Sequence, residues 1–200
     1  MASKITIPDL KKIRVTDPLF SHYAGMVAKK MIPVQWEILN GKQGQSRCFC
    51  IDNFRIAGGT LQGEHRGVVF GDTDAYKWLE AVAYCANNGE TEYIPQADEL
   101  SEIIGQAQQP DGYLNTYFTV CHPELRWKNL TEGHELYSAG HLIEAAVAYY
   151  NATGKRRLLD IAAKFADLIC QTFGDGEGQI PGYPGPQEIE LAPVQLWRVT

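Results

Sequence analysis

Three groups of polar side chains stand where a loop is expected to give way to a helix. They are residues 70–74 (Phe-Gly-Asp-Thr-Asp), 133–135 (Gly-His-Glu) and 187–190 (Gln-Glu-Ile-Glu). Carboxylates and imidazoles in such places can hydrogen-bond the hydroxyl groups of a ligand or act as acids and bases. Each group also has a structural interpretation, because acidic side chains cap helices and complement the helix dipole. For Asp72 and Asp74 taken singly, capping is the stronger of the two interpretations.

The two histidines of the middle group are expected to play different roles. His134 and His141 are separated by nearly two helical turns and therefore share one face of a helix. His134 follows a long loop and opens the helix, which favours contact with a ligand. His141 lies deeper in an apolar stretch, so we expect a buried, hydrogen-bonded core residue.

The remaining candidates for chemistry carry weaker patterns. Glu188 and Glu190 could be read as the paired carboxylates of a glycoside hydrolase. Their spacing, however, does not place them on one helical face. Cys48 and Cys50 would share one side of an extended segment, yet no further Cys or His pair nearby completes a metal site. We therefore predict free, buried thiols and assign no metal ligand within this sequence.

A repeat positions these groups. The segment around Tyr84 and Gly89 recurs around Tyr149 and Gly154, and 149 − 84 and 154 − 89 both equal 65. A repeated unit of helix, glycine turn and helix is typical of an α-helical toroid. The expected helices are 18–39 (kinked or divided at Pro33), 73–87, 96–109, 134–152, 155–172 and one from 187 onward. An extended arm over 4–20 and long connections over 40–68, 114–131 and 174–185 complete the prediction.

Composition excludes several classes of partner. The net charge is −6 and 44% of residues are hydrophobic, with no stripe of Lys and Arg, which argues against binding nucleic acid or an anionic membrane. The longest apolar run is too short to cross a bilayer, and the N-terminus lacks the apolar region of a secretory signal. We therefore predict a cytoplasmic location. The last helical pattern stops before its expected turn, so we expect residues 1–200 to be the N-terminal part of a larger protein.

Seven short motifs occur in the order found in a known enzyme family. They are 15–20 (VTDPLF), 32–37 (IPVQWE), 70–80 (FGDTDAYKWLE), 108–114 (QQPDGYL), 134–137 (HELY), 140–146 (GHLIEAA) and 188–192 (EIELA). Over nearly all its length the chain resembles glycoside hydrolase family 127, the β-L-arabinofuranosidases.

The resemblance implies a mainly α fold in which residues 1–200 form the N-terminal half of a single (α/α)6 barrel. It also implies retaining hydrolysis of terminal L-arabinofuranosides by the full-length protein, with a small carbohydrate as its partner. The family's nucleophile is a zinc-bound Cys thiolate and its acid/base is a Glu, both expected beyond Thr200. No catalytic residue, metal ligand or cofactor is therefore expected within this sequence. A homodimer of the full-length protein is compatible with the resemblance.

What carries over to this sequence is part of a sugar pocket. His134 matches a family histidine that hydrogen-bonds arabinofuranose, and Phe70, Asp72 and Asp74 match a segment of the pocket wall. The chain departs from the family at Pro186, where a second sugar-binding histidine is expected, and at Pro193, inside the following helix. An alternative function is therefore a non-catalytic, carbohydrate-binding helical toroid.

Overall fold

The computed structural model describes residue 8 and residues 10–42 and 48–200, and over these residues the chain is helical. An isolated parallel bridge between Phe173 and Ile180 is its one β-type pairing in the described part. The α-helices are α1 (Pro18–Met26), α2 (Ile32–Leu39), α3 (Cys50–Ala57), α4 (Asp72–Asn87), α5 (Ile94–Ala107), α6 (Thr116–Val120), α7 (Glu135–Thr153), α8 (Arg157–Thr172) and α9 (Glu188–Trp197). Short 3-10 turns at Leu10–Lys12 and Pro123–Leu125 and a π-helical segment at Val27–Met31 complete the described helical segments.

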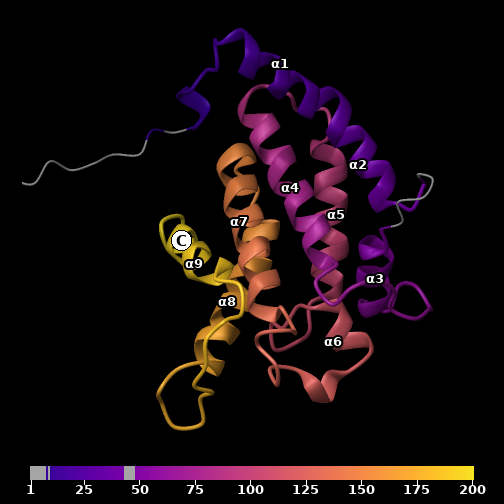
Figure 1. Ribbon diagram of the computed structural model, residues 1–200, viewed down its shortest axis with the longest axis vertical. Helices are drawn as coiled ribbons and strands as arrows, with labels where there is room; N and C mark the ends of the chain where they lie inside the picture. The colour runs from indigo at the N-terminus through magenta and orange to yellow at the C-terminus, as the bar shows by residue number, and fades with distance from the viewer. Residues whose placement is uncertain (1–7, 9, 43–47) are drawn as a thin grey trace, which may run out of the picture.

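The helices form two layers, as expected for part of an (α/α)6 barrel (Figure 1). In one layer α7 packs between α4 and α9, and α2 packs against α4. In the other layer α5 packs between α3 and α8. Within the described ranges, no helix combines the length and apolar character needed to cross a membrane.

The predicted 65-residue repeat is confirmed by the two turns that reverse the chain. Gly89 follows α4 with φ +92°, and Gly154 follows α7 with φ +75°. These left-handed conformations suit glycine because it has no Cβ to clash. Each turn leads into the helix of the second layer, α5 or α8, so the repeat is the helical hairpin itself.

The N-terminal helices begin and divide where the sequence predicts. The Asp17 side chain caps α1 by accepting a hydrogen bond from the backbone N–H of Phe20 at 3.0 Å, and Pro18 occupies the first turn. The helix runs without a break from Pro18 to Leu39 and widens into the π-helical segment Val27–Met31 just before Pro33. Because proline lacks an N–H and its ring crowds the preceding turn, the wider π turn relieves the clash.

Three predicted irregular segments are wrong where the structure describes them, and one of them, 114–131, contains the short helix α6. Residues 40–68 contain α3, whose Ile51 and Phe54 are buried in the core. The eight residues of α3 are too few for a clear helical period, and the glycines around them suggested a loop. The arm expected over 4–20 instead has a 3-10 turn at Leu10–Lys12 and runs into α1 from Pro18, and its residues 4–7 and 9 lie outside the described residues.

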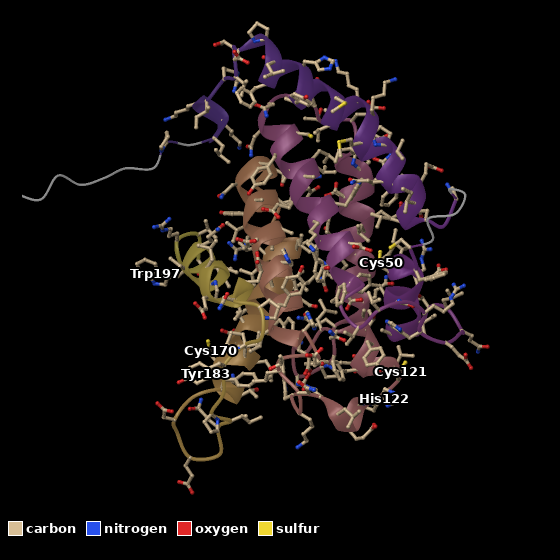
Figure 2. The ribbon with its side chains drawn as sticks, viewed as in Figure 1. Cys50, Cys121, His122, Cys170, Tyr183 and Trp197 are labelled. Carbon is tan, nitrogen blue, oxygen red and sulfur yellow. The ribbon has the colours of Figure 1, made fainter. Side chains whose placement is uncertain are left out.

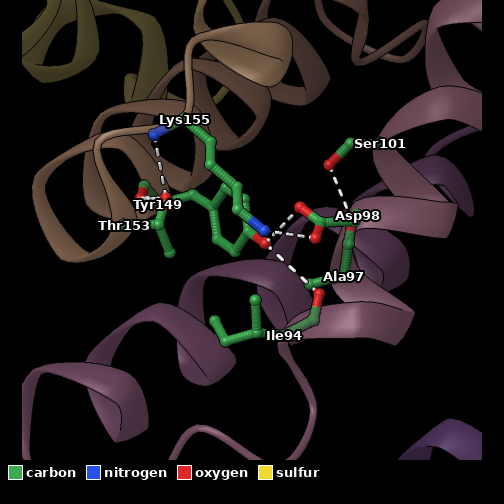
Figure 3. Close-up of polar contacts among 7 residues, drawn as sticks. All are labelled: Ile94, Ala97, Asp98, Ser101, Tyr149, Thr153 and Lys155. Carbon is green, nitrogen blue, oxygen red and sulfur yellow. Dashed lines mark hydrogen bonds and ion pairs between the residues drawn. The ribbon is translucent and has the colours of Figure 1, made fainter.

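A polar contact joins the second layer to the first at the α7–α8 turn (Figure 3). The Tyr149 hydroxyl donates to Asp98 Oδ1 at 2.8 Å, and Lys155 forms an ion pair with the same carboxylate. Tyr149 lies on α7 and Asp98 on α5, so the contact fixes the hairpin α7–α8 against α5. The Tyr149 ring is itself buried, which makes its hydroxyl dependent on this acceptor.

Close approach of α7 and α9 depends on Gly140. A Cβ at this position would lie 2.7 Å from the Glu188 carbonyl carbon and 2.9 Å from the Ile189 nitrogen. Both are backbone atoms, so they cannot move without moving α9. Gly140 therefore sets the separation of the two helices.

We expect Gly140→Ala to lower the free energy of unfolding by about 1–3 kcal/mol through overpacking. Urea unfolding followed by circular dichroism measures the change. The matched control is Gly25→Ala within α1, where a Cβ meets nothing within 4 Å. The control should be neutral or raise stability by about 0.5–1 kcal/mol, because alanine is the better helix former. Equal effects of the two substitutions would contradict the packing argument.

Candidate functional site

Two of the three polar groups meet where α4 and α7 begin. The rings of Phe70 and His134 lie 5.0 Å apart, although the residues are 64 positions apart in the sequence. The loop before α9 brings the third group near the loop before α7. In this contact the Gly185 N–H donates to the Leu130 carbonyl at 3.3 Å. The helix starts thus form one rim, as expected for parallel helices of one barrel layer.

His134 is held in an unusual conformation at this rim. Its φ is +53°, in the left-handed region that residues with a Cβ seldom adopt. Its Nδ1 lies 2.7 Å from the Glu132 carbonyl oxygen. A carbonyl only accepts, so Nδ1 carries the proton and, in the neutral ring, Nε2 is an acceptor. Such a strained, oriented side chain is typical of a functional position.

The buried side chain of Glu135, the residue after His134, stabilises the loop that leads to His134. Its carboxylate accepts hydrogen bonds from the Tyr113 hydroxyl and, at 2.9 Å, from the backbone N–H of Trp127. Trp127, held by this carboxylate, has φ +64° and is, with His134, one of the two non-glycine residues with positive φ among those described. Arg126 covers the Tyr113 ring at 3.7 Å. Burial raises the pKa of Glu135 to about 7, against the stabilising effect of these donors.

Asp72 is buried, and both of its carboxylate oxygens are used within the protein. Oδ2 accepts from the Thr116 N–H at 2.8 Å and Oδ1 from the Thr116 hydroxyl at 2.5 Å. Asp72 therefore caps the distant helix α6 rather than its own. Burial raises its pKa to about 6 even though Thr116 stabilises the charged form. The structure thus places this predicted wall residue beneath the rim.

Asp74 is exposed and lies beside the two cysteines. The Cys48 thiol donates to Asp74 Oδ2 at 3.4 Å, and the sulfurs of Cys48 and Cys50 are 3.3 Å apart. Contact with Cys50 lowers the pKa of the Cys48 thiol, whereas the Cys50 thiol, hydrogen-bonded and buried, has its pKa raised. All five cysteines are free, and Cys50, Cys121 and Cys170 lie well apart (Figure 2).

A series of rings leads along α7 away from the rim. The Tyr137 ring contacts His134 edge-on at 5.6 Å and His141 at 4.6 Å. Its hydroxyl accepts a hydrogen bond from Lys77 Nζ at 2.8 Å, which ties α7 to α4. His134 and His141 are therefore linked through one tyrosine, as their shared helix face predicts.

The prediction that His141 is a satisfied core histidine is wrong. Its buried Nδ1 has no hydrogen-bond partner among the described residues, and the nearest Glu188 oxygen is 3.6 Å away. Burial and the charge of Lys77 lower the pKa of His141. Glu144 lies one turn further along α7, and burial together with neighbouring Glu188 raises its pKa to about 8.

His141, Glu144 and Glu188 form a group that could hold a metal ion, which the sequence analysis did not anticipate. One ligand atom from each lies within 4.8 Å of the others. The spacing of His141 and Glu144 by three positions was a usable signal, since it places both on one helical face. Glu188 comes from α9, and only the tertiary structure brings it to the pair.

The departures from the family at α9 are accommodated locally. Pro186 precedes the helix, and Pro193 is exposed within it. The helix continues through Pro193 to Trp197. Trp197 points away from the packed layers (Figure 2), and its side chain is largely exposed.

We expect the stability of the protein to fall between about pH 4.5 and pH 7 because of Glu135. The folded state raises its pKa from 4.5 to about 7, so the native state binds the proton more tightly than the unfolded state. This contribution is fully present below pH 4.5 and is lost as the pH rises through 7. Its size is at most about 3 kcal/mol.

Unfolding free energies of the wild type and Glu135→Gln, measured from pH 4 to 8, test this expectation. Glutamine can retain the contact with Trp127 but does not titrate, so the variant should show a smaller fall, with the remainder coming from other buried carboxyls such as Asp72 and Glu144. Glu132→Gln, at an exposed position three residues earlier, is the matched control and should follow the wild type. A parallel pH dependence in all three proteins would contradict the role of Glu135.

Comparison with known proteins agrees with this geometry. Residues 12–200 match the family described as β-L-arabinofuranosidase, GH127 catalytic domain. The chain is 36% identical to a non-reducing end β-L-arabinofuranosidase of Bifidobacterium longum subsp. longum, covering 94% of this chain and 31% of that protein.

Two solved structures share the fold. One is a GH127 β-L-arabinofuranosidase from Geobacillus stearothermophilus T6, with 54% identity and a TM-score of 0.89, covering 94% of this chain and 30% of that one. The other is a GH127 β-arabinofuranosidase with 33% identity and a TM-score of 0.87, covering 96% and 31%. The chain spans about a third of the length of these relatives. From its match over residues 12–200, the chain belongs to glycoside hydrolase family 127.

Proposed function

We propose that the complete protein is a retaining β-L-arabinofuranosidase and that residues 1–200 are the N-terminal part of its barrel domain. The family match and the one-third coverage of the relatives support this proposal. The substrate would be a small carbohydrate ending in L-arabinofuranose. Residues 1–200 would supply one wall of the sugar pocket, and the nucleophile and acid/base would come from beyond Thr200.

The observation that carries the proposal is the rim formed by Phe70 and His134. An aromatic face beside an oriented imidazole suits a sugar, which presents both C–H surface and hydroxyl groups. With Nδ1 donating to the Glu132 carbonyl, Nε2 of His134 would accept a hydrogen bond from a sugar hydroxyl. Asp74, exposed at the start of α4, would accept a hydrogen bond from a second sugar hydroxyl.

Asp72 would act in this wall through Thr116. Its two hydrogen bonds hold the start of α6 against the start of α4. Loss of the carboxylate would leave the buried Thr116 N–H unpaired and disturb the base of the wall. We therefore propose His134, Phe70 and Asp74 as the substrate-binding set, with Asp72 as a positioning residue beneath them.

The zinc that the family implies would be held outside this sequence. A zinc thiolate centre needs three or four donors around the ion. Cys48, Cys50 and Asp74 offer two sulfurs and one carboxylate oxygen, but among the described residues these three do not form a group whose donor atoms all lie within 4.8 Å of one another. We therefore derive no catalytic step from this cysteine pair.

For the complete protein acting on an aryl β-L-arabinofuranoside, we expect His134→Ala to lower kcat/KM by roughly 10- to 100-fold. The lost hydrogen bond accounts for about 1–3 kcal/mol of transition-state binding. The melting temperature should change little. The matched control is His122→Ala, at a histidine whose side chain is 43% exposed in the neighbouring loop. Unchanged kcat/KM in His134→Ala would remove His134 from the site.

We further expect residues 1–200 alone to show no turnover of the same substrate. Removing the nucleophile and the acid/base costs many orders of magnitude in rate. The complete protein, assayed in parallel, separates this result from a wrong choice of sugar. Turnover by the 200-residue chain would contradict the placement of the catalytic residues.

A further inference from the structure

His141 and Glu144 lie further along α7 than His134, and neither they nor Glu188, at the start of α9, has a role in the proposed sugar contacts. His141 and Glu144 lie one turn apart on α7, and Glu188 is the first residue of α9. His141 Nδ1 is 3.6 Å from Glu188 Oε1, and one donor atom from each residue lies within 4.8 Å of the others. Three donors from two helices thus converge on one point.

The spacing of these donors matches the coordination shell of a small cation. In a tetrahedral zinc site with bonds of about 2.1 Å, neighbouring ligand atoms lie roughly 3.4 Å apart. The separation of 3.6 Å between His141 and Glu188 is close to that edge. Neutral imidazole and carboxylate groups are both common ligands of divalent first-row metals.

The buried ring nitrogen of His141 is a second observation, independent of the two carboxylates, that points to a bound ion. Its Nδ1 is buried, its side chain is 12% exposed, and it lacks a hydrogen-bond partner among the described residues. Buried polar atoms are almost always paired, so an unpaired nitrogen facing two carboxylates indicates a missing partner. Burial and Lys77 lower the pKa of the imidazole, against the effect of Glu188, and this shift favours the neutral form that binds metals.

The surrounding residues hold the three ligands in place. Gln195 of α9 donates to Glu144 Oε1 at 3.2 Å, and the Tyr137 ring packs edge-on against His141 at 4.6 Å. The tight approach at Gly140 fixes the backbone of Glu188. Outer contacts of this kind orient metal ligands before the ion binds.

The local charge also favours a cation. Glu144 and Glu188 lie close together, and the charge of Glu80 on α4 adds to the field at Glu144. The opposing cation is Lys77, which is directed to the Tyr137 hydroxyl. A bound dication would offset the repulsion between the carboxylates.

We propose that His141, Glu144 and Glu188 bind one divalent first-row transition metal ion, such as Zn²⁺, which links α7 to α9. The single nitrogen donor and the small number of oxygens favour such an ion over Mg²⁺ or Ca²⁺, which prefer shells of oxygen. The site has three protein ligands and is separate from the zinc thiolate centre that the family implies. It does not depend on the proposed function.

The test uses the complete protein, stripped with a chelator and dialysed, and titrated with ZnCl₂ by calorimetry. Bound zinc per chain is counted after dialysis. The wild type should hold one more ion than Glu188→Gln and Glu144→Gln, or bind that ion at least tenfold more tightly. Saturation should raise the melting temperature of the wild type more than that of either variant, because the ion joins two helices.

Glu190→Gln is the matched control, since Glu190 lies in the same first turn of α9 but is exposed and outside the group. It should bind zinc as the wild type does. Circular dichroism of each variant verifies the fold. Equal zinc content and affinity in the wild type, Glu188→Gln and Glu144→Gln would overturn the proposal. Binding of MgCl₂ in preference to ZnCl₂ at this site would overturn the assigned class of ion.

Discussion

Helix α7 is the element on which the rest of the structure depends, because it packs against neighbours on several sides. It contacts α4, α8 and α9, and small residues such as Ala139, Gly140 and Ala145 allow close approach. An alanine- and glycine-rich surface lets helix axes come near each other without voids. The same helix follows directly after His134 and carries His141 and Glu144 along its length. Helix α7 therefore provides both core packing contacts and candidate functional side chains.

The rim is built on a buried carboxylate. Glu135 lies in the core with its pKa raised by burial, yet it accepts hydrogen bonds from two separate parts of the long loop before α7. Burial of such a group is costly unless every oxygen finds a donor. The hydrogen bonds from Tyr113 and Trp127 offset part of this cost, and they hold the loop that leads to His134. A rigid imidazole next to Phe70 is the consequence.

The second group of interest lies further along the same helix face. Tyr137 stands between the two histidines and contacts both rings. Metal binding at His141 would therefore act on a tyrosine that also touches the sugar wall. The two sites are chemically different, since one is a strained imidazole at a rim and the other is a set of three converging donors. The positions of both sites depend on the backbone of α7.

The sequence by itself determined the helices, the glycine turns and the rim. Helical periods and the 65-residue repeat are local patterns, so α4, α7 and their turns at Gly89 and Gly154 could be read directly. The match of Phe70 and His134 to family motifs also predicted which residues lie in one wall, and the structure brings these two rings together. The short helix α3 was missed because eight residues give little periodicity.

Only the tertiary structure decided what depends on contacts between distant segments. Asp72 caps α6 rather than its own helix, since Thr116 comes from 44 positions further along the chain. His141 lacks the partner expected of a core histidine because the nearest acceptor belongs to α9, at a distance beyond hydrogen bonding. Side-chain partners across helices follow from packing angles and close approaches such as Gly140, which no local pattern encodes.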